Sequence, residues 1–100
     1  MFDPDRSHWW IEFDDAKRVR NLAKHGLDFK DAKDAFLGPL VTFIDDRFEY
    51  GEDRYITYAM LRGRVVVIAH TESDSRIRVI SMRKANTDEQ AAYKDGIGEP

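Results

Sequence analysis

One continuous stretch of the chain, residues 54–83, decides the fold, and it reads RYITYAMLRGRVVVIAHTESDSRIRVISMR. It contains three runs rich in β-branched and aromatic residues, at 54–61, 64–71 and 76–83. Such runs are typical of strands, and the connections at 62–63 and 72–75 are short enough for hairpins. The stretch therefore predicts a three-stranded antiparallel meander.

The residues before this stretch predict a short strand at 9–13 and a first helix at 15–25. Asp14 is placed to cap the helix at its start, and Gly26 is placed to end it. At helical spacing the apolar residues share one side, which predicts the face packed on the sheet: Ala16, Val19, Leu22 and Ala23. The opposite side is polar, with Lys17, Asn21 and Lys24 on one stripe and His25 beside it.

Three further elements are expected. Asp28 can cap a second short helix, whose buried face would be Phe29, Ala32, Ala35 and Phe36. Residues 40–44 predict a strand, and the acidic residues 45–53 predict a loop. A last helix begins at Thr87, with Gln90 at capping-box spacing. This order predicts an α+β fold, in which two N-terminal helices cover one face of an antiparallel sheet.

The composition predicts one domain over residues 1–100, with 1–8 as an N-terminal extension and 96–100 as a frayed tail. The first residues lack the layout of a secretory signal and no apolar run is long enough to span a membrane, so we expect a cytoplasmic protein. The chain has no cysteine, which excludes disulfides, thiol nucleophiles and cysteine-ligated zinc.

Charge is unevenly distributed along the chain. The net charge of −3 argues weakly against binding to nucleic acid. Residues 54–84, however, hold 7 Lys and Arg against 2 acids, whereas residues 1–53 hold 8 against 13. A positive face could therefore form on an acidic protein. The alternative, that charged segments of sequence do not become surface patches, stays open.

Arginines cluster on the predicted meander, at Arg54, Arg62, Arg64, Arg76, Arg78 and Arg83. Their planar guanidinium groups suit bidentate contacts with phosphate. Regular alternation over 76–83 would place Arg76 and Arg78 with Ile80 and Met82, and Arg83 with Ile77 and Val79. The alternative is a solvated strand with ion pairs to Glu72 or Asp74.

Histidines offer weaker candidates. His25 ends the first helix after Lys24, where it could serve as an acid or base, or could simply complement the helix dipole. His70 lies within a strand and is expected to be half-buried and hydrogen-bonded. The three histidines are far apart and show no metal-ligand spacing, so no metal or cofactor is expected. The acidic loop 45–53 lacks the alternate-ligand pattern of a calcium site.

Three ordered motifs resemble the BrnT family of bacterial toxins, and the resemblance covers residues 13–93. The first motif comprises Phe13, Asp14, Lys17, Asn21, Lys24, His25, Gly26 and Phe29. The second comprises Gly51, Glu52 and Arg54. The third comprises His70, Thr71, Glu72, residues 76–81, Arg83, Ala85, Glu89 and Tyr93.

This resemblance implies a RelE-like fold and a ribonuclease that halts translation. It also implies neutralisation by a BrnA-like antitoxin, in a complex expected to be 2:2. This complex would repress its own operon, and the toxin would meet DNA only indirectly, through the antitoxin. We expect metal-independent cleavage, in which a ribose 2′-hydroxyl attacks the adjacent phosphate. The expected catalytic residues are Arg54, Arg76 and Arg83 as a phosphate clamp, His25 or Glu72 as base, and Lys24 as a second phosphate contact. Further RNA-binding candidates are Lys17, Arg64, Arg78 and Lys84.

Two other kinds of function remain open from the sequence. A binding module without catalysis could use the same basic sheet to hold an acidic or disordered peptide. A structural oligomerisation domain would need an exposed apolar patch, for which Trp9 and Trp10 are the only hints.

Overall fold

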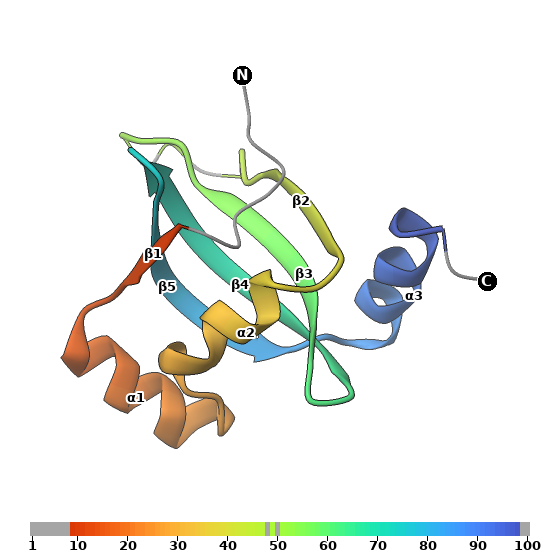
Figure 1. Ribbon diagram of the computed structural model, residues 1–100, viewed down its shortest axis with the longest axis horizontal. Helices are drawn as coiled ribbons and strands as arrows, with labels where there is room; N and C mark the ends of the chain where they lie inside the picture. Colours follow the sequence, from red (N-terminus) through yellow and green to blue (C-terminus); the bar gives the residue numbers. More distant parts are fainter. Residues whose placement is uncertain (1–8, 48, 50, 99–100) are drawn as a thin grey trace.

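The computed structural model describes residues 9–47, 49 and 51–98, and it shows an α+β fold around one five-stranded sheet (Figure 1). The strand order is β1-β5-β4-β3-β2. The strands are β1 (Trp10–Glu12), β2 (Leu40–Ile44), β3 (Tyr55–Leu61), β4 (Arg64–Ser73) and β5 (Arg76–Lys84). The predicted extension at 1–8 lies outside the described residues.

The predicted meander is confirmed as β3, β4 and β5, which pair antiparallel in sequence order. The β3–β4 turn has positive φ at Arg62 and Gly63, of 49° and 82°. The β4–β5 turn has positive φ at Asp74 and Ser75, of 49° and 62°. Two consecutive positive φ angles match the twist of a two-residue hairpin. The sheet is nevertheless mixed rather than wholly antiparallel, because β1 runs parallel to β5 at its outer edge.

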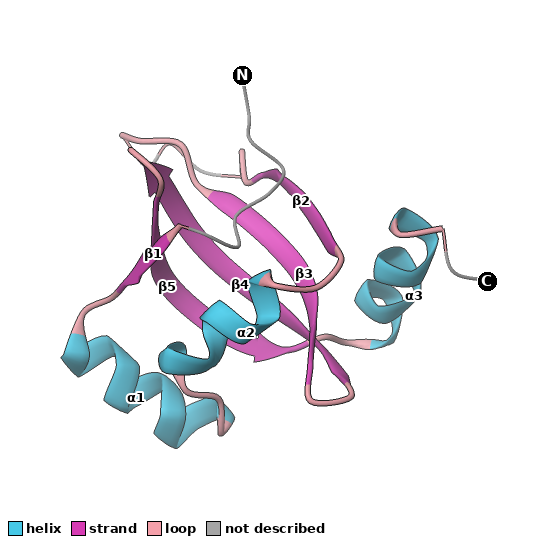
Figure 2. Cartoon of the chain, in the orientation of Figure 1, coloured by secondary structure: helices cyan, strands magenta, loops and turns pink. Residues whose placement is uncertain are grey.

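Helices α1 (Asp15–His25) and α2 (Ala32–Phe36), with the single turn η1 (Phe29–Asp31) between them, lie against one face of the sheet (Figure 2). We call this the covered face, and the other the open face. The predicted caps Asp14, Gly26 and Asp28 are present. The core forms between the helices and the covered face, and its residues include Phe29, Ala32, Ala35, Phe36, Val66, Ile68, Ile77 and Met82.

The predicted orientation of α1 is wrong. Val19 and Leu22, predicted to be buried, are 59% and 40% exposed, and Ala16 and Ala23 are also exposed. Asn21, predicted to be on the polar side, is buried. Its amide group donates to the Met82 and Leu27 carbonyls at 2.9 and 3.1 Å and accepts from the Met82 N–H at 3.2 Å.

The reason lies at the outer edge of β5. Strand β1 pairs only with residues 76–78 of β5, so the β5 edge beyond them has no neighbouring strand among the described residues. A buried backbone N–H or C=O without a partner is costly. An asparagine side chain offers both a donor and an acceptor, and Asn21 therefore completes the β5 edge in place of a strand.

A β-bulge corrects the predicted alternation of β5. Val79 pairs with His70 and Ser81 pairs with the adjacent Ala69, so Ile80 is an extra residue. Beyond this bulge each side chain points to the face opposite to that expected from regular alternation. Met82 consequently joins Ile77 and Val79 in the core. Arg83 joins Arg76 and Arg78 on the open face.

Helix α3 (Thr87–Gly96) follows β5 and packs beside β2 and β3. Its capping box is formed by Asn86 and Glu89, one residue before the predicted pair Thr87 and Gln90. The predicted frayed tail begins at Gly96, but the Ile97 N–H still donates to the Tyr93 carbonyl at 3.1 Å. Residues 99–100 lie outside the described part. None of the helices described is both long and apolar enough to cross a membrane.

Candidate active site

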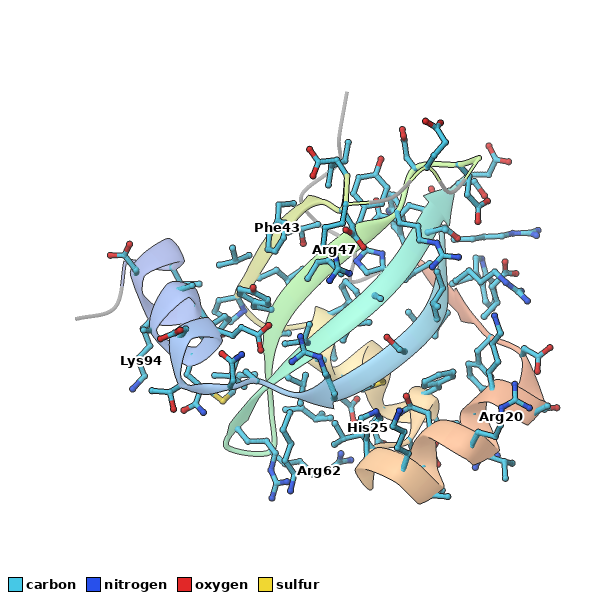
Figure 3. The ribbon with its side chains drawn as sticks, turned by 180° about the vertical axis from the view of Figure 1, so that it is seen from behind. Arg20, His25, Phe43, Arg47, Arg62 and Lys94 are labelled. Atoms are coloured by element: carbon cyan, nitrogen blue, oxygen red, sulfur yellow. The ribbon has the colours of Figure 1, made fainter. Side chains whose placement is uncertain are left out.

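The open face of the sheet carries the polar cluster of greatest chemical interest, and Figure 3 views the molecule from this side. Strands β3, β4 and β5 contribute Tyr58, Val67 and Arg83, which face the same way because Tyr58 pairs with Val67 and Val67 pairs with Arg83. Glu89 reaches the cluster from the first turn of α3. These residues line a cavity of about 290 Å³ at the β2 side of the sheet, together with Phe43, Ile44, Asp45, Asp46, Arg47 and Ile56.

Arg83 and Glu89, which both line this cavity, form a bidentate ion pair. The Arg83 Nη1 and Nη2 atoms lie 2.7 and 2.8 Å from Oε1 and Oε2 of Glu89. The Arg83 side chain is 43% exposed, whereas that of Glu89 is 16% exposed. Glu89 also accepts from the Asn86 N–H at 3.0 Å, so the cap of α3 fixes its position. The Arg83 side chain thus remains partly accessible although both of its Nη atoms are paired with Glu89.

The pair sets the charge states of its members. The hydrogen bonds to Glu89 raise the pKa of Arg83, and the same contact, helped by the Asn86 N–H, lowers the pKa of Glu89. Burial, with the charge of Glu89 as a second cause, raises the pKa of Tyr58. At neutral pH the cavity therefore holds a cation, a carboxylate and a protonated phenol.

A second arginine borders the cavity from the loop after β2. Arg47 forms a bidentate pair with Asp45, with the Arg47 Nε and Nη2 atoms 2.7 and 2.9 Å from its two carboxylate oxygens. Asp45 is 4% exposed in its side chain, and Arg47 is 68% exposed. Figure 3 shows Arg47 beside Phe43 at the β2 side of the sheet. The buried carboxylate thus anchors an exposed guanidinium at the rim.

The predicted arginines of β5 share the open face with this cavity. Arg76 and Arg78 are exposed and lie towards the β1 edge, where Arg78 Nη1 is 3.9 Å from Glu12 Oε1. Arg54 directly precedes β3, and its carbonyl accepts from the Asp45 N–H at 2.7 Å. By strand alternation Arg54 has the same direction as Ile56 and Tyr58. The structure therefore gathers Arg54, Arg76, Arg78 and Arg83 on one side of the sheet.

The other predicted site residues lie elsewhere. Glu72, predicted as a candidate base, has a side chain only 5% exposed and lies 3.4 Å from Nδ1 of His70. His70 is fully buried on the covered face, where its Nε2 is 2.7 Å from the Thr57 hydroxyl. This pair contributes to the polar interior, apart from the arginines of the open face.

The remaining candidates form two separate groups. Lys17, Lys24 and His25 belong to α1, on the covered side (Figure 3). Arg64 and Lys84 border a different groove at the β3–β4 hairpin, together with Lys94 of α3. Neither group contributes a residue to the cavity of Arg83 and Glu89.

Sequence reasoning missed three residues of the cavity as site residues: Arg47, Tyr58 and Glu89. Tyr58 lies two residues after Ile56 on a predicted strand, so the two share a face, and this spacing could have placed Tyr58 on the open face. Glu89 is part of the family motif and carried a signal for that reason. Arg47 lies inside an acidic loop, and nothing in its local sequence indicates a partner in Asp45.

In the part of the chain that the structure describes, no group of three or more His, Cys, Asp or Glu residues could hold a metal ion. The acidic loop 45–53 borders a separate surface pocket, whose lining residues include Asp46, Glu49, Glu52 and Asp53.

The fold and this site define a class: a small α+β protein whose open sheet face carries arginines, a carboxylate and a phenol, which are groups chemically suited to a polyanionic ligand. Residues 13–89 match the family model described as the ribonuclease toxin, BrnT, of type II toxin–antitoxin systems. The chain belongs to this family of ribonuclease toxins.

A solved structure supports the assignment. The chain is similar to the Brucella abortus ribonuclease toxin BrnT, known from a crystal structure at 1.1 Å resolution, with 32% sequence identity and a TM-score of 0.60. The match covers 79% of this chain and 99% of the Brucella chain. A search of curated proteins finds no match.

Proposed function

We propose that this ribonuclease toxin cleaves RNA in the open-face cavity, by a metal-independent reaction that uses no cofactor. The observation that carries the proposal is the bidentate Arg83–Glu89 pair beside Tyr58 in one cavity. A phosphodiester needs a cation for its charge, a proton acceptor for the attacking hydroxyl and a proton donor for the leaving oxygen. This cavity holds one residue suited to each role.

The reaction would proceed by attack of the ribose 2′-hydroxyl on the adjacent phosphorus. The O2′–P bond forms as the P–O5′ bond breaks, which yields a cyclic phosphate and a free 5′-hydroxyl. Arg83 stabilises the charge on the phosphorane, Glu89 accepts the 2′ proton and Tyr58 donates a proton to O5′. Arg76 and Arg78 hold the RNA backbone along β5, and Arg54 is retained as a clamp residue. The base role moves from His25 or Glu72 to Glu89, because Glu89 alone of the three lines the cavity.

The partner assignments are part of the same proposal. The type II toxin–antitoxin family implies an antitoxin partner. We propose that this antitoxin is BrnA-like, that the complex is 2:2 and represses its operon, and that the toxin acts in the cytoplasm. The RelE-like description of the fold is also proposed, supported by helices on one sheet face and a site on the other. The mass of the co-purified complex tests the stoichiometry.

The experiment compares the purified wild type with Arg83→Ala, Glu89→Gln and Tyr58→Phe on a labelled single-stranded RNA. We expect the loss of Arg83 to reduce cleavage about 100-fold or more, as for removal of a group that stabilises the transition state. Arg20→Ala is the matched control, because Arg20 is an exposed arginine of α1 (Figure 3), and it should cleave normally. A cyclic phosphate should end the 5′ product, and cleavage should persist in EDTA.

Growth of cells provides the second measurement. Induced wild type should arrest growth, whereas Arg83→Ala or co-expression of the antitoxin should restore it. Full toxicity of the Arg54, Arg76 and Arg83 alanine variants would contradict the clamp. Unimpaired growth with soluble wild type, together with intact RNA, would favour the non-catalytic binding module.

A further inference from the structure

An exposed tryptophan stands on the open face at the β1 edge of the sheet. Trp10 is 74% exposed, the highest value among the large hydrophobic side chains that the structure describes. Strand β1 pairs Trp10 with Arg76, Ile11 with Ile77 and Glu12 with Arg78. Ile77 is fully buried on the covered face, so Trp10 and Arg76 project together from the open face.

The fold itself does not require an indole at this position. Strand β1 contributes Ile11 to the core, and the neighbouring Trp9 and Phe13 also pack against it. A single exposed apolar side chain is common on protein surfaces, but an indole ring beside an exposed guanidinium suits a ligand that has both a flat apolar face and a negative charge. Since every base has an apolar face and every nucleotide a phosphate, an aromatic ring beside a guanidinium suits unpaired RNA.

We propose that Trp10 stacks an unpaired base of the RNA substrate while Arg76 binds the adjoining phosphate. The inference rests on the proposed cleavage at Arg83, because it places the substrate along the same face. The seven residue steps from Arg76 to Arg83 span roughly 20 Å of strand. RNA stacked at about 3.4 Å per nucleotide would need about six nucleotides to reach from one arginine to the other. Trp10 thus acts as a remote subsite for substrates of that length.

The first measurement is binding of a 12-nucleotide single-stranded RNA whose 2′-hydroxyls are all methylated, so that it cannot be cleaved. Trp10→Ala should bind this RNA about tenfold or more weakly than the wild type, because one stacked base is lost. Trp10→Phe should keep most of the affinity because it retains an aromatic ring. Leu37→Ala is the matched control, because Leu37 is 58% exposed and follows α2 on the covered side, and it should bind like the wild type. Thermal unfolding checks that each variant is folded.

Two further readouts separate stacking from a general loss of affinity. Cleavage of a dinucleotide, too short to reach Trp10, should be unchanged in Trp10→Ala, whereas cleavage of the unmethylated 12-mer at subsaturating concentration should fall. In Trp9→Phe, Trp10 is the only tryptophan that remains. Its fluorescence should be quenched by the methylated 12-mer.

Each contrary outcome has a distinct meaning. Equal affinity of Trp10→Ala and wild type for the 12-mer, with RNA still cleaved, would overturn this inference and leave the proposed function intact. Weaker binding to the antitoxin with unchanged binding to RNA would also overturn it and assign Trp10 to a protein interface. Binding of the 12-mer through Trp10 without any cleavage of RNA by the wild type would overturn the proposed function instead.

Discussion

Asn21 shows how one polar residue can set the orientation of a helix. Its amide satisfies both backbone groups of Met82 at the β5 edge and also bonds to the Leu27 carbonyl. Neighbouring apolar residues of α1, such as Val19 and Leu22, remain exposed. Leaving buried backbone groups without hydrogen-bond partners costs more free energy than partial burial of these two side chains would contribute to stability.

Replacing Asn21 by alanine should therefore lower the free energy of unfolding by about 3 kcal/mol, because the N–H and the C=O of Met82 would both lose their hydrogen bond to the Asn21 side chain. Leu22→Ala, next to it on α1 but 40% exposed, is the control and should cost less than about 1 kcal/mol. Urea unfolding measures both values. A larger loss for Leu22→Ala would show that α1 packs through its apolar side after all.

The lowered pKa of Glu89 should make the stability of the fold depend on pH. Its folded pKa is lowered, chiefly by Arg83, so the unfolded chain binds its proton more readily. Such a group stabilises the fold above its unfolded pKa, near 4.5, and this contribution is lost as the pH falls towards the folded pKa. Asp14 and Asp28 also have lowered pKa values and act in the same direction.

Glu89→Gln should consequently reduce the slope of stability against pH below about 4.5 without abolishing it, because the two aspartates remain. Urea midpoints between pH 3 and 7 measure the slope. If the variant and the wild type lost stability in parallel as the pH falls, the Arg83–Glu89 ion pair would make no contribution to the pH dependence of stability.

At the scale of the element, the bulge of β5 decides which face Arg83 occupies. A strand alternates its side chains, so one extra residue exchanges the faces of all residues beyond it. Because Ile80 is that extra residue, Met82 enters the core and Arg83 reaches Glu89. With Ile80 present, the bulge absorbs the extra residue, and Arg83 therefore falls on the open face beside Glu89.

Deletion of Ile80 should give a regular strand in which Val79 and Met82 still face the core. We expect a folded protein with a cooperative thermal transition and an intact Arg83–Glu89 pair. Deletion of Val67 from the regular part of β4 is the contrast, because it exchanges the faces of its neighbours and should abolish folding. Circular dichroism of both variants tests this difference, and an unfolded Ile80 deletion would contradict the assignment of the extra residue.

At the scale of the whole molecule, an acidic protein carries a row of arginines along one strand. The chain is acidic overall, with a net charge of −3, yet Arg76, Arg78 and Arg83 line one strand of the open face. Many acids lie in the loop after β2 or pair with arginines, as Asp28 does with Arg18. An acidic protein can therefore still present a local row of cations to RNA.

RNA binding should weaken steeply with salt. If the three arginines of β5 each neutralise one phosphate, the logarithm of the association constant should fall with that of the salt concentration at a slope of about −2. Arg78→Ala should reduce this slope by about 0.7, whereas Arg20→Ala on α1 should leave it unchanged. Titrations of the methylated RNA at several salt concentrations provide the slopes. Equal effects of the two substitutions would show that the open face is not the RNA surface.

Much of the fold follows from local rules that act within a few residues. Alternating apolar runs and short turns determined the meander of β3, β4 and β5, and the caps at Asp14, Gly26 and Asp28 determined where α1 begins and ends and where η1 begins. The arginines of β5 were predicted as phosphate ligands from their residue type alone, and this stays a prediction. These features depend on backbone preference and residue chemistry, which the sequence contains directly.

Other features depended on contacts between distant residues. Asn21 is buried because an edge 61 positions away lacks a strand, and the bulge at Ile80 depends on how β5 pairs with β4. Glu89 meets Arg83 only because α3 turns back beside the sheet. The sequence by itself therefore determined the elements and the chemistry of the arginines, whereas the tertiary structure decided which faces they occupy, because burial and pairing are settled only when separate elements pack together.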